Sequence, residues 1–181
     1  MFATLFAKKK ITKKKLAYNF VHHTLNVIDE TYSDFLDAIY YDPELKTHPQ
    51  LNYEDSSEIA LIVIAGNIKY FERILSISEE NEIVNEVIIQ MAIIYGVEVI
   101  EMRETLESYS SFISRVNHPS KNILYGISKA IFFKFNLGQH QEEYFAQLNT
   151  PNPVFLKRID ILIENYIWDW KNIFDKNKIT S

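Results

Sequence analysis

The chain has 181 residues with four glycines, five prolines and no cysteine, a length and composition that predict one globular domain with a continuous core. The lack of cysteine excludes a disulfide framework, thiolate zinc sites and a thiol nucleophile, so we expect a cytoplasmic protein. The formal charge of −5 is unevenly placed, because residues 1–15 carry six lysines and no acid, whereas the rest carries 24 acidic and 13 basic residues. The acidic body argues against nucleic-acid binding, which needs a basic face.

The N-terminal lysines follow a short apolar stretch instead of preceding it, so we expect no signal peptide, and no apolar run is long enough to span a membrane. We interpret residues 1–12 as a basic, flexible arm ahead of one helical domain at 13–178. The positive end of a helix dipole disfavours cations, so helix stability does not explain these lysines. The arm is either frayed and solvated or it docks on an anionic membrane surface, an acidic partner or the acidic body of the protein itself. The candidate contact residues in it are Phe2, Phe6, Lys8, Lys9, Lys10, Lys13, Lys14 and Lys15.

Apolar residues recur at spacings of three and four from about Thr12 to Lys178, which predicts helix almost throughout. Prolines and capping residues divide this pattern into segments at about 12–41, 55–76, 78–115, 120–136, 139–148 and 153–176. Most connections are short, so sequential helices are expected to pack antiparallel. The prediction is an all-α fold, a single-domain antiparallel bundle of five or six helices.

Gly66, Gly96 and Gly126 are spaced by 30 residues, and each falls inside a predicted helix. Glycine in a helix costs about 1 kcal/mol relative to alanine, so these positions are expected to mark close helix crossings. No further positions repeat with this period, which argues against a solenoid. Gly138 is predicted to cap the end of the segment 120–136.

Motifs that carry familiar chemistry are missing from the sequence. It has no His-Glu-x-x-His, no Gly-x-Ser-x-Gly, no Ser-x-x-Lys and no glycine-rich phosphate loop. Glu-x-x-His, which carboxylate-bridged metal bundles require, is absent as well. We therefore expect no cofactor and no catalytic residue set.

Four residues are weak candidates for a metal site. His22 and His23 are adjacent on the first helix and point about 100° apart, so they cannot both serve one metal ion. His23 falls on the apolar stripe and is expected in the core, while His22 is expected in solvent. His140 and Glu143 have i,i+3 spacing, which supplies two zinc ligands but not three.

Two other features are candidates for a contact surface. The irregular segment 42–55, with His48 and Tyr53, is either a lid or partner-recognition loop or a tether between the first helix and the rest. Trp168 points away from the inward stripe of the last predicted helix, so it is either an interface anchor or partly buried against a neighbouring helix.

These observations favour a non-enzymatic helical protein that acts through protein–protein contacts, as an adaptor, an inhibitor or an immunity-type protein. Lysine outnumbers arginine 15 to 4, and isoleucine and asparagine are abundant, a bias typical of bacterial genomes with low GC content. The partner of this protein is expected to be another protein or a second copy. One alternative is a protein that binds an apolar small molecule between helices, motivated by the many aromatic residues and isoleucines. The other is a metal-dependent enzyme that uses scattered histidines and carboxylates.

Overall fold

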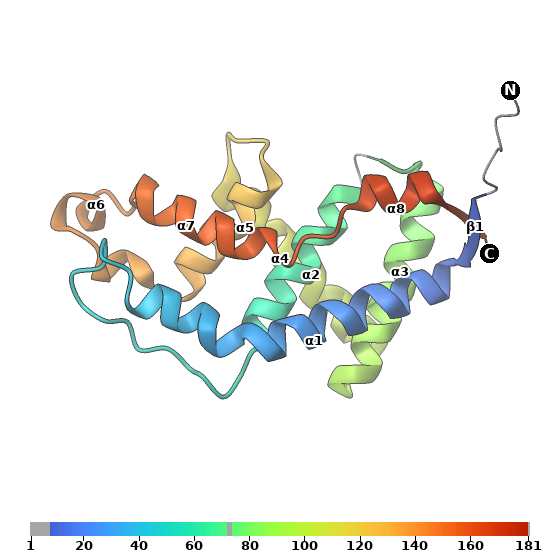
Figure 1. The fold of residues 1–181 in the computed structure, drawn as a ribbon, viewed down its shortest axis with the longest axis horizontal. Coiled ribbons are helices and arrows are strands. Elements are labelled where there is room, and N and C mark those ends of the chain that lie inside the picture. The colour runs from blue at the N-terminus through green and yellow to red at the C-terminus, as the bar shows by residue number, and fades with distance from the viewer. Residues whose placement is uncertain (1–7, 72–73, 181) are drawn as a thin grey trace, which may run out of the picture.

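The computed structural model describes residues 8–71 and 74–180 (Figure 1). These residues form eight α-helices, one 3₁₀ helix (η1) and two short strands, which confirms the all-α prediction. The elements in chain order are β1 Lys9–Thr12, α1 Lys13–Tyr40, α2 Ser57–Phe71, α3 Ile77–Tyr95, α4 Val99–Asn117, α5 Ile123–Lys134, η1 Leu137–His140, α6 Glu143–Gln147, α7 Pro153–Glu164, α8 Trp170–Lys176 and β2 Asn177–Thr180.

The first helix begins and ends as its sequence predicts. The Thr12 side chain accepts a hydrogen bond from the Lys15 backbone N–H at 3.2 Å, and the helix ends just before Asp42-Pro43. Its inward stripe packs against α2 and α3. α2 is buried on most of its circumference, and it also contacts α4 and α5, so it lies at the centre of the core.

Two predicted helices are each broken in the structure, so the single antiparallel bundle of five or six helices is not confirmed. The segment 78–115 is α3 followed by α4, which meet at a bend of 111°. Gly96 ends α3 with a φ of 66°, a left-handed conformation that glycine adopts at little cost. The segment 153–176 is α7 followed by α8, with residues 165–169 outside any helix.

The predicted helix 139–148 is also different, because it divides into η1 and the short α6. The left-handed residue after α5 is Asn136, with a φ of 52°, and not Gly138. Asparagine tolerates this conformation better than most residues with a side chain, which explains how α5 ends two residues earlier than expected.

Gly66 and Gly126 do mark close helix crossings. A Cβ atom on Gly66 would lie 2.3 Å from Ile127 Cδ1, where α2 crosses α5. A Cβ atom on Gly126 would lie 2.9 Å from Asn117 Cγ, where α5 meets the end of α4. A Cβ atom on Gly96, in contrast, would meet no atom of the described residues within 4 Å, so the role of this glycine is conformational.

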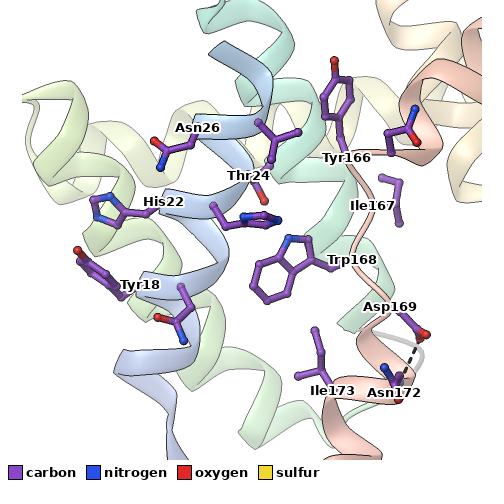
Figure 2. Close-up of a pocket in the computed structure, with 14 residues that line it drawn as sticks. Tyr18, His22, Thr24, Asn26, Tyr166, Ile167, Trp168, Asp169, Asn172 and Ile173 are labelled. Atoms are coloured by element: carbon purple, nitrogen blue, oxygen red, sulfur yellow. Dashed lines mark hydrogen bonds between the residues drawn. The ribbon is translucent and has the colours of Figure 1, made fainter. Parts of the chain in front are cut away.

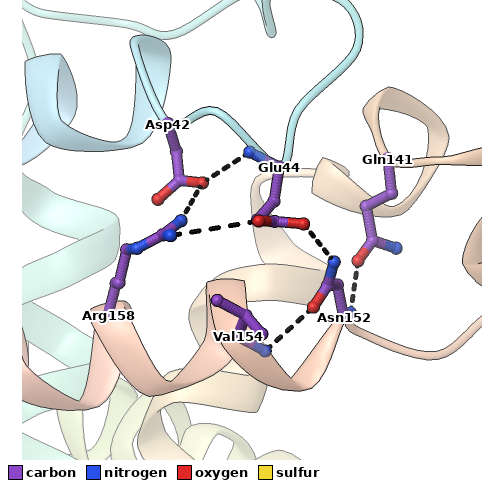
Figure 3. A network of polar contacts seen from close by, with 6 residues as sticks. All are labelled: Asp42, Glu44, Gln141, Asn152, Val154 and Arg158. Atoms are coloured by element: carbon purple, nitrogen blue, oxygen red, sulfur yellow. Dashed lines mark hydrogen bonds and ion pairs between the residues drawn. The ribbon is translucent and has the colours of Figure 1, made fainter.

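Residues 41–56, here called the strap, run from the end of α1 past η1 and α7 and then back to α2 (Figures 1 and 3). The buried Asp42 carboxylate accepts from Arg158 Nη1 at 2.7 Å, and Glu44 Oε2 accepts from Asn152 Nδ2 at 2.7 Å. Further along, the Tyr32 hydroxyl donates to the carbonyls of Asn52 and Asp55. These contacts hold the strap against α1 and α7.

The two chain ends meet in a small parallel sheet, in which β1 pairs with β2. Residues 9–12 of the predicted arm therefore form a strand, and Figure 1 shows this sheet at the opposite end of the molecule from α6. No single helix in the described part of the chain is long and apolar enough to cross a membrane; α3 and α4 meet that test of length and composition only when counted together across their bend.

Candidate functional site

A groove of about 700 Å³ lies between α1 and the segment that joins α7 to α8 (Figure 2). We call it the Trp168 groove. One wall is made by α1 residues Tyr18, Asn19, His22, His23, Thr24, Asn26 and Val27. The other wall is made by Asn165, Tyr166, Ile167, Trp168, Asp169, Asn172 and Ile173.

The second wall owes its irregular shape to Asn67, a fully buried residue of α2. Its side-chain Nδ2 donates to the carbonyls of Val63 at 3.0 Å and Tyr166 at 3.1 Å. Its Oδ1 accepts from the Trp168 backbone N–H at 3.0 Å and from Trp170 Nε1 at 3.1 Å. Both donors and both acceptor positions of the amide are therefore used, which fixes the backbone between α7 and α8.

Asn67 was not predicted to be important from the sequence, although the sequence carries one signal for it. Asn67 is an amide within the most apolar stretch of the chain, and a buried amide needs partners. Backbone groups freed by a helix break supply such partners.

Trp168 is half-buried and lines the groove. Its ring stacks on Trp170 at 5.2 Å between centroids and meets the Phe20 ring edge-on at 5.3 Å. One part of the indole is thus held against the core, while the rest remains available to a ligand. The side chain is partly buried against α1, as one of the two sequence interpretations proposed.

The structure corrects the expected positions of His22 and His23. His23 is exposed and lies edge-on to Trp168 at 5.7 Å, whereas His22 is half-buried and packs on the Tyr18 ring at 4.1 Å. The buried stripe of α1 passes through Phe20 and Thr24, which leaves position 23 at its edge. Both histidines line the same groove, together with Trp168.

Four asparagines line the groove in two pairs. Asn19 and Asn26 lie on α1, and Asn165 and Asn172 lie on the opposite wall, so each pair is separated by seven residues. Within the part of the chain that the structure describes, the side-chain amides of Asn19, Asn26 and Asn172 make no hydrogen bond. The buried Thr24 hydroxyl at this wall also lacks a partner among the described residues.

The formal charge of the groove is low. Asp169 is the only carboxylate among the lining residues, and its Oδ1 accepts from the Asn172 backbone N–H at 3.1 Å at the start of α8. Among the described residues, no lysine or arginine lines the groove. The groove therefore offers neutral hydrogen-bonding groups beside an aromatic surface, and it fits a neutral polar ligand better than a charged one.

His140 and Glu143 lie in η1 and α6, near the end of the molecule where α6 is labelled in Figure 1. His140 Nδ1 is 2.8 Å from Thr47 Oγ1, and burial lowers the pKa of this imidazole. Glu143 accepts from Gln147 at 2.9 Å. No group of three or more metal-ligating side chains occurs among residues 8–71 and 74–180.

His48 and Tyr53 belong to the strap and make contacts within the protein. The His48 ring stacks on Tyr40 at 4.3 Å. The Tyr53 hydroxyl donates to Asp37 at 2.8 Å, and burial together with this hydrogen bond raises the pKa of Tyr53 to about 12.

The lysines of the predicted arm have different surroundings. Lys13 forms an ion pair with Glu82, Lys8 donates to the Phe174 carbonyl, and Lys15 lies over the Tyr18 ring. Lys9 and Lys10 belong to β1, and Lys14 is exposed on α1. Phe2 and Phe6 lie outside the described residues.

No protein-family model, curated protein or solved structure matches this chain. The interpretation of the Trp168 groove therefore depends on its own geometry.

Proposed function

We propose that this protein is a non-enzymatic interaction module that binds an extended segment of a partner protein in the Trp168 groove. The observation that carries the proposal is the placement of two asparagine pairs on opposite walls of a groove, one of which also presents a half-buried tryptophan. We also propose a cytoplasmic location, which is supported only by the lack of cysteine in the sequence.

The asparagine amides suit a peptide backbone. Each side-chain amide donates and accepts hydrogen bonds, as each backbone peptide group does. Asn19 and Asn26 are separated by seven residues, about 10 Å along α1, a distance that an extended peptide covers in about three residues. One wall can therefore contact the same strand at two points.

Trp168 supports the same interpretation. An indole held by Trp170 and Phe20 loses little further freedom when a peptide side chain packs on it. Rigid, partly exposed tryptophans are frequent anchors of protein interfaces. The side-chain amides of Asn19, Asn26 and Asn172, which are unpaired among the described residues, are polar groups that a ligand in the groove can satisfy.

An apolar small molecule is the second candidate for this groove, because much of the lining surface is apolar. The unpaired asparagine amides on both walls favour the peptide. The metal-dependent enzyme has no supporting cluster of side chains within the described ranges.

Peptide selection tests the proposal. Random peptides displayed on phage are selected on the immobilised full chain and counter-selected on the Trp168→Ala variant. Dissociation constants of the enriched peptides are then measured by fluorescence anisotropy. Asn26→Ala and Asn172→Ala are each expected to weaken binding about five- to tenfold, the effect of one or two lost hydrogen bonds.

Tyr144→Ala is the matched control, because this side chain is 66% exposed on α6 and does not line the groove. It should leave the dissociation constant unchanged, and thermal melting should show that all variants are folded. If no peptide is enriched, or if the asparagine variants bind as tightly as the wild type, the proposal is wrong. Quenching of tryptophan fluorescence by apolar small molecules in the absence of peptide binding would favour the alternative ligand class.

A further inference from the structure

The sheet that joins the chain ends has an unusual composition. β1 and β2 pair in parallel with the same tripeptide in register, so Lys10 lies opposite Lys178, Ile11 opposite Ile179 and Thr12 opposite Thr180. Parallel sheets are normally larger than this and are covered on both faces. Two strands alone are only marginally stable in water, so this sheet depends on the packing of its isoleucines against the body.

One face of this sheet carries a like-charge pair. Ile11 and Ile179 pack against the core, so the alternation of a strand directs Lys10 and Lys178 to the other face, where both are exposed. Like charges directly opposite each other destabilise a strand pair. In the described part of the chain, Lys9, Lys10 and Lys178 form no ion pair, whereas the neighbouring Lys13 is paired with Glu82.

The backbone of the sheet is also incompletely paired. Within the described residues each strand is bonded only to the other, so the outer edges of β1 and β2 present free N–H and C=O groups. Lysines at such an edge discourage pairing with a second copy of the same strand. They favour a strand of opposite charge.

We propose that the β1–β2 sheet is a second binding site, which takes an acidic, extended strand of a partner protein by strand addition. The main-chain groups of the ligand pair with a free edge of the sheet, and its carboxylates lie against Lys10 and Lys178. A membrane or a nucleic acid would use the charge but not the strand edge. An acidic polypeptide strand uses both the lysine charges and the free strand edge. This site is separate from the Trp168 groove.

The test uses a fluorescein-labelled peptide in which glutamate and valine alternate, with anisotropy measured against the full chain. One comparison peptide has lysine in place of glutamate. A second is N-methylated at alternate residues, which removes the backbone donors of one edge and keeps the charge. Phosphatidylserine-containing vesicles are assayed in parallel.

The Lys10→Gln/Lys178→Gln variant is expected to bind the acidic peptide about tenfold more weakly, since it loses charge-assisted contacts. Its melting temperature should be unchanged or higher, because the like-charge pair is removed. The control Lys157→Gln changes an exposed lysine of α7 and should bind as the wild type does, and so should Asn26→Ala of the other site. The N-methylated peptide and the lysine peptide are both expected to bind the wild-type protein more weakly than the acidic peptide does.

Equal binding of the N-methylated peptide would show attraction by charge alone and would overturn strand addition. Binding to the vesicles without binding to the acidic peptide would overturn the protein ligand. If the Lys10→Gln/Lys178→Gln variant binds the acidic peptide as tightly as the wild type does, the peptide does not bind at β1 and β2.

Discussion

Asn67 organises a surface about 100 residues further along the chain, through hydrogen bonds to the backbone and side chains around Trp168. Its position in the C-terminal half of α2 puts its amide where the break between α7 and α8 frees a carbonyl and an N–H group. The Asn67 side chain supplies the hydrogen-bond partners that the backbone loses at the helix break, and the backbone in turn pairs the buried amide. These hydrogen bonds determine the shape of the second wall of the groove.

Asn67→Ala is predicted to lower the free energy of unfolding by about 2–4 kcal/mol, because it leaves buried groups at Tyr166, Trp168 and Trp170 without partners. Urea denaturation followed by tryptophan fluorescence measures this loss. The matched variant Asn26→Ala removes an exposed amide with no partner among the described residues, and it should change stability by less than about 0.5 kcal/mol. Equal stabilities of the two variants would contradict the structural role of Asn67.

At the level of residues, the sequence identified Trp168, His22 and His23 as notable but could not bring them together. Helical periodicity predicts which side of a helix is buried, but it does not fix the burial of a residue at the edge of the apolar stripe. His23 is such a residue: it was expected in the core and is exposed. The partners of a buried amide depend on contacts between distant segments, so periodicity cannot reveal them.

Helix crossings are set by single glycines. Gly66 lets α2 approach α5 so closely that a Cβ atom would overlap Ile127 Cγ1 and Cδ1. A Cβ atom on Gly96 would have no described neighbour within 4 Å, so glycine is needed there for the left-handed φ of 66°. The two glycines therefore answer different physical requirements, although they occur in similar apolar stretches.

Gly66→Ala is predicted to cost about 1–3 kcal/mol of unfolding free energy through overpacking. The cost should fall in an Ile127→Ala background, where the new methyl group enters the space that the isoleucine leaves. Gly96→Ala should cost about 1–2 kcal/mol through backbone strain, with no rescue by Ile127→Ala. A double-mutant cycle in urea measures both, and an additive result for Gly66 would show that the crossing is not tight.

Helix ends were predicted well where the signal is local, as at the Thr12 cap and at Asp42-Pro43. Helix breaks were missed where apolar residues continue across them, as in Ile93–Ile100 around Gly96 and in Tyr166–Trp170. A continuing apolar pattern looks the same whether the helix runs on or turns back to bury the next segment, so only tertiary packing separates the two cases.

The whole molecule is joined by contacts between distant parts of the chain. The strap connects the end of α1 to α7 through Asp42 and Arg158, and the terminal strands pair with each other (Figures 1 and 3). From the sequence, a tether was one of two interpretations of the segment 42–55, but neither its ion pair nor the strand pairing was predicted, because a single ion pair and a strand of four residues carry no periodic signal. The all-α class was predictable since it depends on the average pattern of the chain.

Arg158→Met is predicted to destabilise the protein by about 1–2 kcal/mol, because it leaves the Asp42 carboxylate buried without its cation. The loss is smaller than for a fully buried pair, since the Arg158 side chain is 40% exposed. Thermal unfolding measures the effect. Lys157→Met, on the exposed side of the same helix, should unfold as the wild type does; a similar loss in both variants would mean that the strap contact contributes nothing.

Hydrogen–deuterium exchange of the full chain with a selected peptide tests the central proposal most directly. Binding in the Trp168 groove predicts slower exchange in the α1 segment 18–27 and in residues 165–173, with no change in α6. Protection confined to other segments, or no protection at saturating peptide, would contradict the assignment of this groove as the site of partner binding.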